Sequence, residues 1–501
     1  MKLWKLCQAA GIEYPDAYAD LEITKIISDS RLCEEGCLYI CIRGLHTDGH
    51  TYIAEALQKG AVCVLVEEAA EQELPTGALY LTVRNTRRAE ALLCNAFFGD
   101  PVSKMKFIGV TGTNGKTSIT HMLRAILEAS LCKCGLVGTL GYLWGEKRIG
   151  GGAHNTLANM TTPDPYVLYP LLAQMAEDGV EYVLMEVSSH ALALEKLAPI
   201  CFEAGIFTNL TPDHLDFHKT MDAYAEAKAG LFKKCKKAII NADSPYAEKM
   251  LQSAVAAKTC TAERRRADYR AEAIHLHARQ GVEFKLCSNR THLQLKCPIA
   301  GGFTVMNAMQ AAICALELGF GAPAVKTALA SMGGVKGRME RVRLGMAADF
   351  DVLIDYAHTP DALQKLLQTA RETVESNGRV VLLFGCGGDR DKSKRSVMGR
   401  ISVKLADAVI VTSDNSRSED PEQIIADILE GMETAPVTVI PNRRDAIRYA
   451  VLNARRGDLI LLAGKGHEEY EIDKNGKSYF SETEIVKQAF EERLRQEGTE
   501  A

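Results

Sequence analysis

Residues 109–117 (GVTGTNGKT) have the residue types that hold the phosphates of a nucleoside triphosphate. The mostly apolar segment 105–110 before them predicts a buried strand, and a helix is expected from about Ser118. A strand that turns through glycines into a helix presents backbone N–H groups to phosphate oxygens. The glycines at 109, 112 and 115 depart from the usual phosphate-loop spacing, so a glycine-rich turn with a solvated lysine is the alternative. The ATP-phosphate contacts predicted here are Gly112, Thr113, Asn114, Gly115, Lys116 and Thr117, with the Thr117 hydroxyl on Mg²⁺.

Polar residues also follow two other predicted strands. Residues 186–190 (EVSSH) come directly after the apolar run 182–185, where the Glu186 carboxylate is well placed to bind Mg²⁺. A solvated or salt-bridged glutamate is the alternative. Residues 208–218 (TNLTPDHLDFH) gather two histidines and two aspartates, and His214 is the best metal or phosphate candidate among them. A solvated loop histidine is equally compatible with these positions, and no further ligands at zinc spacing are evident.

The order of apolar and amphipathic segments predicts an α/β protein with three parts: 1–104, 105–334 and 335–501. The first part mixes short strands (38–42, 61–66) with helices (52–59, 88–98). In the other two parts strands alternate with helices, which implies parallel sheets with helices on both faces. Residues 258–300 are expected to be a small antiparallel addition before a helix at 307–318. The expected strands are 107–110, 182–187, 204–208 and 238–241 in the middle part, and 351–355, 380–384, 408–412 and 459–462 in the last.

Composition excludes several classes of protein. The chain has 501 residues, 47% of them apolar and 25% charged, which is ordinary for a globular protein of two to four domains. A net charge of -5 gives no basic surface for nucleic acid. The sequence contains no apolar run of membrane-spanning length and no signal-peptide core, so we expect a cytoplasmic protein. Its fifteen scattered cysteines are expected to be reduced and mostly buried.

The motifs together resemble one family. Residues 111–117, 186–190, 209–216 and 355–363 (DYAHTPDAL) are similar to those of the Mur ligases, ATP-dependent amide-bond enzymes of peptidoglycan precursor synthesis. The resemblance implies three domains: an N-terminal UDP-sugar domain, a central phosphate-loop ATPase built on a parallel sheet, and a Rossmann-like C-terminal domain. The segments that resemble the members adding the third residue of the stem peptide are 29–31, 48–50, 161–164, 337–340, 387–391 and 464–468.

The resemblance also implies roles that spacing does not reveal. Lys228, which the pattern alone makes a surface helix lysine, falls where the family carries a lysine carbamylated by CO₂. It would act with Lys116 and His214 in catalysis, and with Glu186, His214 and Thr117 in binding Mg²⁺. The other implied contacts are Asn307, Arg338 and Asp355 for adenine, phosphate and ribose, Ser30 for uridine, and Thr161, Thr162, Ser188 and Lys196 for the acyl substrate.

Arg390, Asn415, Arg417, Gly464 and Glu468 match the pocket for the incoming amino acid. Meso-diaminopimelate carries a second ammonium and carboxylate at its far end, which Glu468 and Arg417 would take. Lysine has no distal carboxylate and would leave the arginine unpaired, so diaminopimelate is favoured. Two positions depart from the family: Ser416 replaces a proline, and Lys196 stands where some members have an arginine.

We therefore expect an ATP- and Mg²⁺-dependent ligase that joins meso-diaminopimelate to UDP-N-acetylmuramoyl-L-alanyl-D-glutamate through an acyl phosphate, working as a monomer. The alternatives are a lysine-adding Mur ligase, a folylpolyglutamate-type ligase and a non-catalytic ATP-binding regulator. Residues 29–31 (DSR) argue against the folate reading, because they have no evident task without a UDP-sugar.

Overall fold

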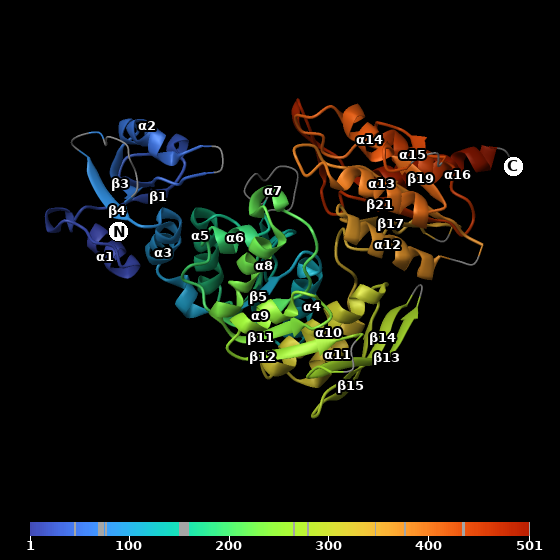
Figure 1. The fold of residues 1–501 in the computed structure, drawn as a ribbon, viewed down its shortest axis with the longest axis horizontal. Helices are drawn as coiled ribbons and strands as arrows, with labels where there is room; N and C mark the ends of the chain where they lie inside the picture. Colours follow the sequence, from blue (N-terminus) through green and yellow to red (C-terminus); the bar gives the residue numbers. More distant parts are fainter. Residues whose placement is uncertain are drawn as a thin grey trace.

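The computed structural model describes residues 1–44, 47–68, 75, 78–149, 160–263, 266–277, 280–345, 347–374, 377–432 and 436–499. The chain forms a four-stranded, an eleven-stranded and a six-stranded sheet. In Figure 1 the first of these lies at one end of the molecule, the second in the middle and the third at the other end. The three sheets follow one another along the chain, and the bounds 1–104, 105–334 and 335–501 stay a prediction.

The four-stranded sheet is parallel, in the order β1-β2-β3-β4. The strands expected near 38–42 and 61–66 and the helices expected at 52–59 and 88–98 are confirmed in this first part of the chain. Its two outer strands and its N-terminal helix were not predicted. Its elements are α1 (Leu3–Ala10), β1 (Lys25–Ile27), β2 (Cys37–Ile40), α2 (Ile53–Gln58), β3 (Ala61–Glu67), β4 (Leu79–Val83) and α3 (Thr86–Phe97), with 3₁₀ turns at Asp16–Tyr18, Ser30–Leu32, Gly49–Tyr52 and Pro101–Lys104.

In the eleven-stranded sheet, β5 (Lys106–Thr111) lies between β10 (Phe202–Phe207) and β9 (Tyr182–Glu186), parallel to both. The full order is β15-β14-β13-β12-β11-β10-β5-β9-β6-β7-β8. The chain leaves β5 and returns on either side of it, which is the place where open α/β sheets bind ligands. The other strands are β6 (Cys134–Gly138), β7 (Gly141–Trp144), β8 (Lys147–Ile149), β11 (Cys235–Asn241), β12 (Ala257–Thr261), β13 (Tyr269–His277), β14 (Gly281–Cys287) and β15 (His292–Cys297).

Alternating side chains give this sheet two buried faces. Phe107 of β5 packs in one hydrophobic cluster with α5 and α8, and the next residue, Ile108, packs in another with α4 and α10. The expected parallel sheet with helices on both faces is thereby confirmed. The helices are α4 (Lys116–Ala129), α5 (Pro165–Glu177), α6 (Ser189–Ala193), α7 (Leu215–His218), α8 (Met221–Ala229), α9 (Ala247–Ser253), α10 (Gly302–Glu317) and α11 (Ala322–Ala330), with a 3₁₀ turn at Phe232–Lys234.

The structure corrects several sequence-based expectations here. Helix α4 begins at Lys116 rather than Ser118, because Gly115 is its left-handed N-cap with φ of 89°. Helix α10 begins at Gly302 rather than Asn307. The expected antiparallel addition is present as β13-β14-β15, but a second one, β6-β7-β8, was not anticipated.

The six-stranded sheet has the order β16-β17-β21-β18-β19-β20, and only the first pair is antiparallel. Its four central strands confirm the expected ones to within one residue. The elements are β16 (Glu340–Arg341), β17 (Asp351–Asp355), α12 (Pro360–Thr373), β18 (Val380–Phe384), α13 (Lys394–Leu405), β19 (Ala408–Val411), α14 (Pro421–Leu429), β20 (Thr438–Val439), α15 (Arg443–Leu452), β21 (Leu459–Ala463), the hairpin β22 (Tyr470–Asp473) and β23 (Gly476–Tyr479), and α16 (Glu482–Thr499).

All fifteen cysteines are free thiols and twelve are buried, as expected. In the described ranges, no helix combines the length and the apolar character needed to cross a membrane.

The first sheet is tied to the middle one by a shared core in which α3 packs against α5. Glu90 of α3 is buried there, with Ser28 as its hydrogen-bond partner and Asp164 and Lys196 nearby. Desolvation raises the pKa of Glu90 to about 7, so near neutral pH this carboxyl is part protonated in the fold.

Because the pKa of Glu90 is higher in the folded than in the unfolded protein, the protonated carboxyl stabilises the fold. This stabilisation is fully present below the ordinary pKa of 4.5 and is lost as the pH rises through 7. We therefore expect Glu90→Gln to be more stable than the wild type at pH 8, by up to roughly 3 kcal/mol. The gain should shrink toward pH 5. Thermal unfolding of both proteins at the two pH values measures this, and an equal change at both would contradict it.

Candidate active site

The glycine-rich loop between β5 and α4 is held by the segment that follows β10. The backbone N–H groups of Thr113 and Asn114 donate to the backbone and side-chain oxygens of Asn209, at 3.0 Å each. The Thr208 hydroxyl donates to the carbonyl of Asn114 at 2.6 Å. Gly112 has φ of 147° and lies against Thr208 so closely that a Cβ would overlap it. The loop therefore has one defined shape set by its neighbour strand.

Two lysines converge on this loop. Lys116 Nζ donates to the carbonyls of Gly112 and Thr113 at 2.8 Å, and Lys228 Nζ donates to the same Gly112 carbonyl at 2.9 Å. Lys228 is 1% exposed, so the surface position that the helix pattern indicated is wrong. Burial, and secondarily the charge of Lys116, lower the pKa of Lys228 well below its usual value.

Glu186 lies at the end of β9, fully buried beside the start of α4. Its Oε2 accepts from the hydroxyls of Thr117 at 2.9 Å and Thr139 at 3.0 Å, and its Oε1 accepts from the Thr139 backbone N–H. These are oxygen donors of the kind that Mg²⁺ prefers. In the part of the chain that the structure describes, no three His, Cys, Asp or Glu side chains form a ready-made metal site. A bound Mg²⁺ would thus need ligands from a phosphate as well.

His214 precedes α7 in a left-handed conformation, with φ of 53°. Its backbone N–H donates to Asp213 Oδ1 at 2.9 Å, and its ring packs edge-to-face on His190 at 4.9 Å between centroids. Desolvation lowers the pKa of His214, so the neutral ring is the form present near pH 7. A neutral imidazole can ligate a metal or accept a hydrogen bond from a substrate.

The other wall of the pocket comes from the six-stranded sheet. Arg338 Nη2 donates to the Thr117 hydroxyl at 3.3 Å and stacks on the ring of Tyr356. Asn114 of the loop donates to Asp361 of α12 at 3.1 Å. Residues of both sheets therefore line one cavity: Thr113, Asn114, Gly115, Lys116, Thr117, Ser118, Thr139, Thr161, Glu186, Asn209, Asp213, His214, Phe303, Asn307, Arg338, Met339, Asp355, Tyr356, Ala357, His358, Ala362, Lys365 and Leu366.

Thr161, Thr162, Ser188 and Lys196 surround the segment after β9. Thr162 donates to the carbonyl of Glu186 and accepts from the Ser188 N–H, while the Ser188 hydroxyl caps α6. Lys196 pairs with Asp164 at 2.6 Å. Ser30 is elsewhere: it begins the 3₁₀ turn Ser30–Leu32, donates to Glu55 of α2 and is not part of this cavity's lining.

The residues predicted to bind an amino acid meet at the carboxyl ends of β18, β19 and β21. Asn415 Nδ2 donates to Glu468 Oε2 at 2.7 Å, and Arg417 Nη1 donates to the carbonyl of Gly388 at 2.7 Å. Desolvation raises the pKa of Glu468. Gly464 approaches the carboxylate of Asp414, and Arg390 is exposed on the neighbouring loop.

Sequence reasoning missed Lys465, although it lies inside a motif that was singled out. The side chain is 0% exposed, and Nζ donates to Asn415 Oδ1 at 2.9 Å and to the Tyr470 carbonyl at 2.8 Å. Asp414 is 3.7 Å away. Because Lys465 occupies the Asn415 oxygen, the Asn415 amide group must face Glu468. Asn209 was also missed, although it lies directly after a predicted strand and inside the segment 209–216 that the sequence analysis singled out.

Comparison with known proteins decides the family. Three family descriptions match along the chain: "Mur ligase family, catalytic domain" at 22–97, "Mur ligase middle domain" at 110–315 and "Mur ligase, glutamate ligase domain" at 337–466. The UDP-N-acetylmuramoyl-L-alanyl-D-glutamate--2,6-diaminopimelate ligase 1 of Clostridium acetobutylicum is 42% identical over 98% of this chain and 100% of its own. The chain belongs to the Mur ligase family.

Other known proteins also align with most of this chain. The diaminopimelate ligase of Caldanaerobacter subterraneus is 43% identical over 94% of this chain and 96% of its own. A solved structure of a UDP-N-acetylmuramoyl-L-alanyl-D-glutamate--2,6-diaminopimelate ligase aligns with a TM-score of 0.69 at 30% identity, over 99% of this chain and 100% of that one. Folylpolyglutamate synthase of Mycobacterium tuberculosis, solved with ADP and AMPPCP, shares the fold at a TM-score of 0.62 and 20% identity, over 75% of this chain and 92% of its own.

Replacing Lys465 tests the buried polar network of this Mur ligase. We expect Lys465→Met to lower the free energy of unfolding by about 3 kcal/mol, because the buried Asp414 carboxylate and the Asn415 oxygen lose their cationic partner. Arg390→Met, at an exposed position, is the control and should change stability by less than about 0.5 kcal/mol. Urea unfolding measures both, and equal effects would contradict the assignment.

Proposed function

We propose that this Mur ligase uses ATP to join meso-diaminopimelate to the D-glutamate carboxyl of UDP-N-acetylmuramoyl-L-alanyl-D-glutamate. The observation that carries the proposal is the shared cavity, in which the loop lysine Lys116, the carboxylate Glu186 and Arg338 of the other sheet face one space. A nucleoside triphosphate fits the positive groups, and a ligase needs such a site beside the acyl and amine pockets.

The first step is attack of the acceptor carboxylate oxygen on the γ-phosphorus of ATP. An O–P bond forms, the bond to the β-phosphate oxygen breaks, and ADP leaves with that electron pair. Phosphoryl transfer requires mainly positioning and charge neutralisation. Lys116 and Arg338 supply positive charge on opposite walls, and Thr161 and Lys196 lie where the acceptor would enter.

In the second step the amine nitrogen of diaminopimelate attacks the acyl phosphate carbon. The new C–N bond forms, phosphate leaves with the C–O electrons, and the amine gives up a proton. Glu468, to which the Asn415 amide donates, would hold the distal ammonium, and Arg417 the distal carboxylate. Walls from two sheets also exclude water, which would otherwise hydrolyse the acyl phosphate.

Thr117, Glu186 and His214 are the side chains that would hold Mg²⁺, which when bound neutralises phosphate charge. Lys228 is proposed to be carbamylated. An amine must be unprotonated to attack CO₂, and burial lowers the pKa of Lys228 accordingly. Attack of the neutral Nζ on the CO₂ carbon forms an N–C bond while a C=O electron pair moves to oxygen, and loss of one N–H proton leaves a carbamate anion beside the Lys116 cation.

A folylpolyglutamate-type ligase is less well supported. That neighbour aligns with 75% of this chain, while the diaminopimelate ligases align with nearly all of it. Ser30, in the turn Ser30–Leu32 beside the four-stranded sheet, donates its hydroxyl to Glu55 and is the residue proposed to meet the uridine of a UDP-sugar. A monomeric enzyme acting in the cytoplasm completes the proposal.

Phosphate release from ATP tests the function. With the UDP-linked dipeptide as acceptor, we expect release to depend on the amino acid and to be at least tenfold faster with meso-diaminopimelate than with L-lysine. Preference for lysine would keep the ligase and refute the role of Arg417. Phosphate release at the same rate with and without the acceptor would refute the ligase activity.

Lys116→Ala should lower this turnover by at least a hundredfold while the fold survives, because the loop loses the charge that meets the phosphates. Lys104→Ala, an exposed lysine in the turn before β5, is the matched control and should be unchanged. Wild-type-like turnover in folded Lys116→Ala would overturn the assignment of the loop.

Carbamylation of Lys228 is measured by ¹³C NMR of the protein in ¹³C-bicarbonate. We expect a carbamate carbon signal in the wild type that is missing in Lys228→Met. Turnover should also fall when CO₂ is removed from the buffer and return when bicarbonate is restored. A spectrum without a signal that depends on Lys228 would refute the modification.

A further inference from the structure

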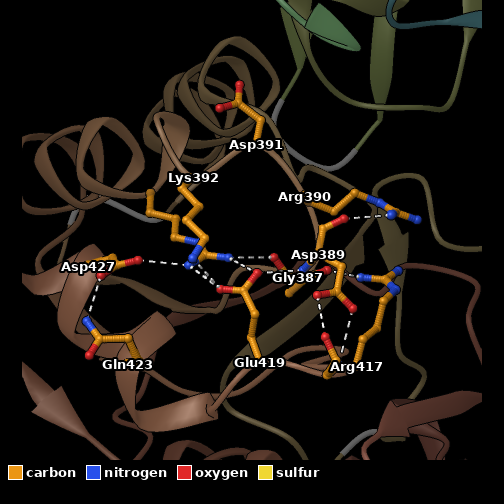
Figure 2. Close-up of polar contacts among 12 residues, drawn as sticks. Gly387, Asp389, Arg390, Asp391, Lys392, Arg417, Glu419, Gln423 and Asp427 are labelled. Atoms are coloured by element: carbon orange, nitrogen blue, oxygen red, sulfur yellow. Dashed lines mark hydrogen bonds and ion pairs between the residues drawn. The ribbon is translucent and has the colours of Figure 1, made fainter. Parts of the chain in front are cut away.

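A buried arginine joins the two loops that carry the pocket arginines. Residues 385–392, after β18, form the glycine loop, and residues 413–420, after β19, form the arginine loop. Arg395 of α13 is 0% exposed and donates to both carboxylate oxygens of Glu419 at 3.0 Å and to Asp427 at 2.8 Å. It also donates to the Gly387 carbonyl at 3.3 Å. Figure 2 shows Gly387, Glu419 and Asp427, the partners of Arg395 in these contacts.

Glu419 itself reaches across to the glycine loop. Its Oε1 accepts from the backbone N–H of Asp389 at 2.6 Å. In return, the Asp389 carboxylate accepts from the Ser418 hydroxyl at 2.6 Å and from the Ser418 N–H at 3.2 Å (Figure 2). The hydrogen bond from Arg395 holds the pKa of Glu419 at about 2, so this carboxylate stays ionised under all working conditions.

Between these contacts the two backbones touch. The Gly388 N–H donates to the Asn415 carbonyl at 2.9 Å, and a Cβ on Gly388 would overlap the carbonyl oxygen of Ser416. The Gly388 carbonyl accepts from Arg417 Nη1 at 2.7 Å. The direction of the Arg417 guanidinium therefore depends on where Gly388 lies, and Gly387 and Asp389 on either side of Gly388 are held by Arg395 and Glu419.

We propose that Glu419 is a positioning residue for the incoming amino acid: with Arg395 it fixes the glycine loop, so that the Gly388 carbonyl aims Arg417 into the pocket. The identity of the amino acid rests on the proposed function. Arg417 uses Nη1 for carbonyls of the protein and keeps its remaining N–H groups for a carboxylate. A guanidinium held in its binding direction loses less side-chain entropy when the ligand binds.

Asp427 provides a matched comparison within the same network. It pairs with the same guanidinium, but its other hydrogen bond goes to Gln423 of α14 rather than to the glycine loop. Glu419→Gln and Asp427→Asn therefore each remove one negative charge from Arg395. Only the first weakens the link between the two loops.

The test is phosphate release by the full-length enzyme at varied meso-diaminopimelate, with KM for ATP and thermal unfolding measured alongside. We expect Glu419→Gln to raise KM for diaminopimelate at least tenfold and to leave KM for ATP within twofold. Both variants should have a lower melting temperature than the wild type, but Asp427→Asn should leave both KM values within twofold. Ser418→Ala, at an exposed position, tests the same link if Glu419→Gln does not fold, and should raise KM for diaminopimelate about threefold.

An unchanged KM for diaminopimelate in Glu419→Gln, or an equal rise in Asp427→Asn, overturns the positioning role. So does an unchanged KM in Ser418→Ala. Wild-type release that ignores diaminopimelate overturns the proposed function instead, and the positioning role with it.

Discussion

The side-chain nitrogens of Lys116 and Lys228 both donate to one carbonyl oxygen, that of Gly112, and much of the site follows from this contact. A second positive charge so close to Lys116 in a buried setting is costly, which lowers the pKa of Lys228, and positive charge there needs negative charge to meet it. Glu186 and Asp213 supply part of it from the protein. Lys116 and Arg338 line the cavity itself, and their positive charge favours an anionic ligand such as the phosphates of a nucleotide. The tight loop around Gly112 keeps both lysines at that oxygen.

A second constraint is the way that parallel sheets gather their loops. In both larger sheets the polar residues follow strand ends, so each site is assembled from segments far apart in sequence. Asn209 after β10 holds the loop after β5, and Asn415 after β19 meets Glu468 after β21. Each of these loops is held by hydrogen bonds to a neighbouring loop. The polar residues that bind ligands thus lie on the loops, whereas the apolar residues that stabilise the fold lie on the strands.

The sequence predicted the strands well because buried apolar runs are local signals, as β17 and β18 show. It also located Lys116, Glu186 and His214, since each directly follows such a strand or lies in its loop. It could not reveal the burial of Lys228, because α8 has almost no amphipathic pattern to mark an inner face. Nor could it reveal the pairing of Arg395 with Glu419, since that contact depends on how two loops from separate strands pack. Long-range contacts of this kind leave no periodic trace.

The cavity between the eleven-stranded and six-stranded sheets has one further consequence. Because Thr117 lies on α4 of the middle part and Arg338 lies just before β16 of the last part, a nucleotide bound there would act as a removable cross-link between two halves of the enzyme. By linkage, the factor by which the nucleotide favours the aligned arrangement of the halves equals the factor by which that arrangement tightens nucleotide binding. Substitutions in the connecting segment near Gly333 and Gly334, where the glycines have open space around them, can thus change affinity for ATP without touching it. The dissociation constant of the nucleotide therefore reports how strongly the two halves favour the aligned arrangement.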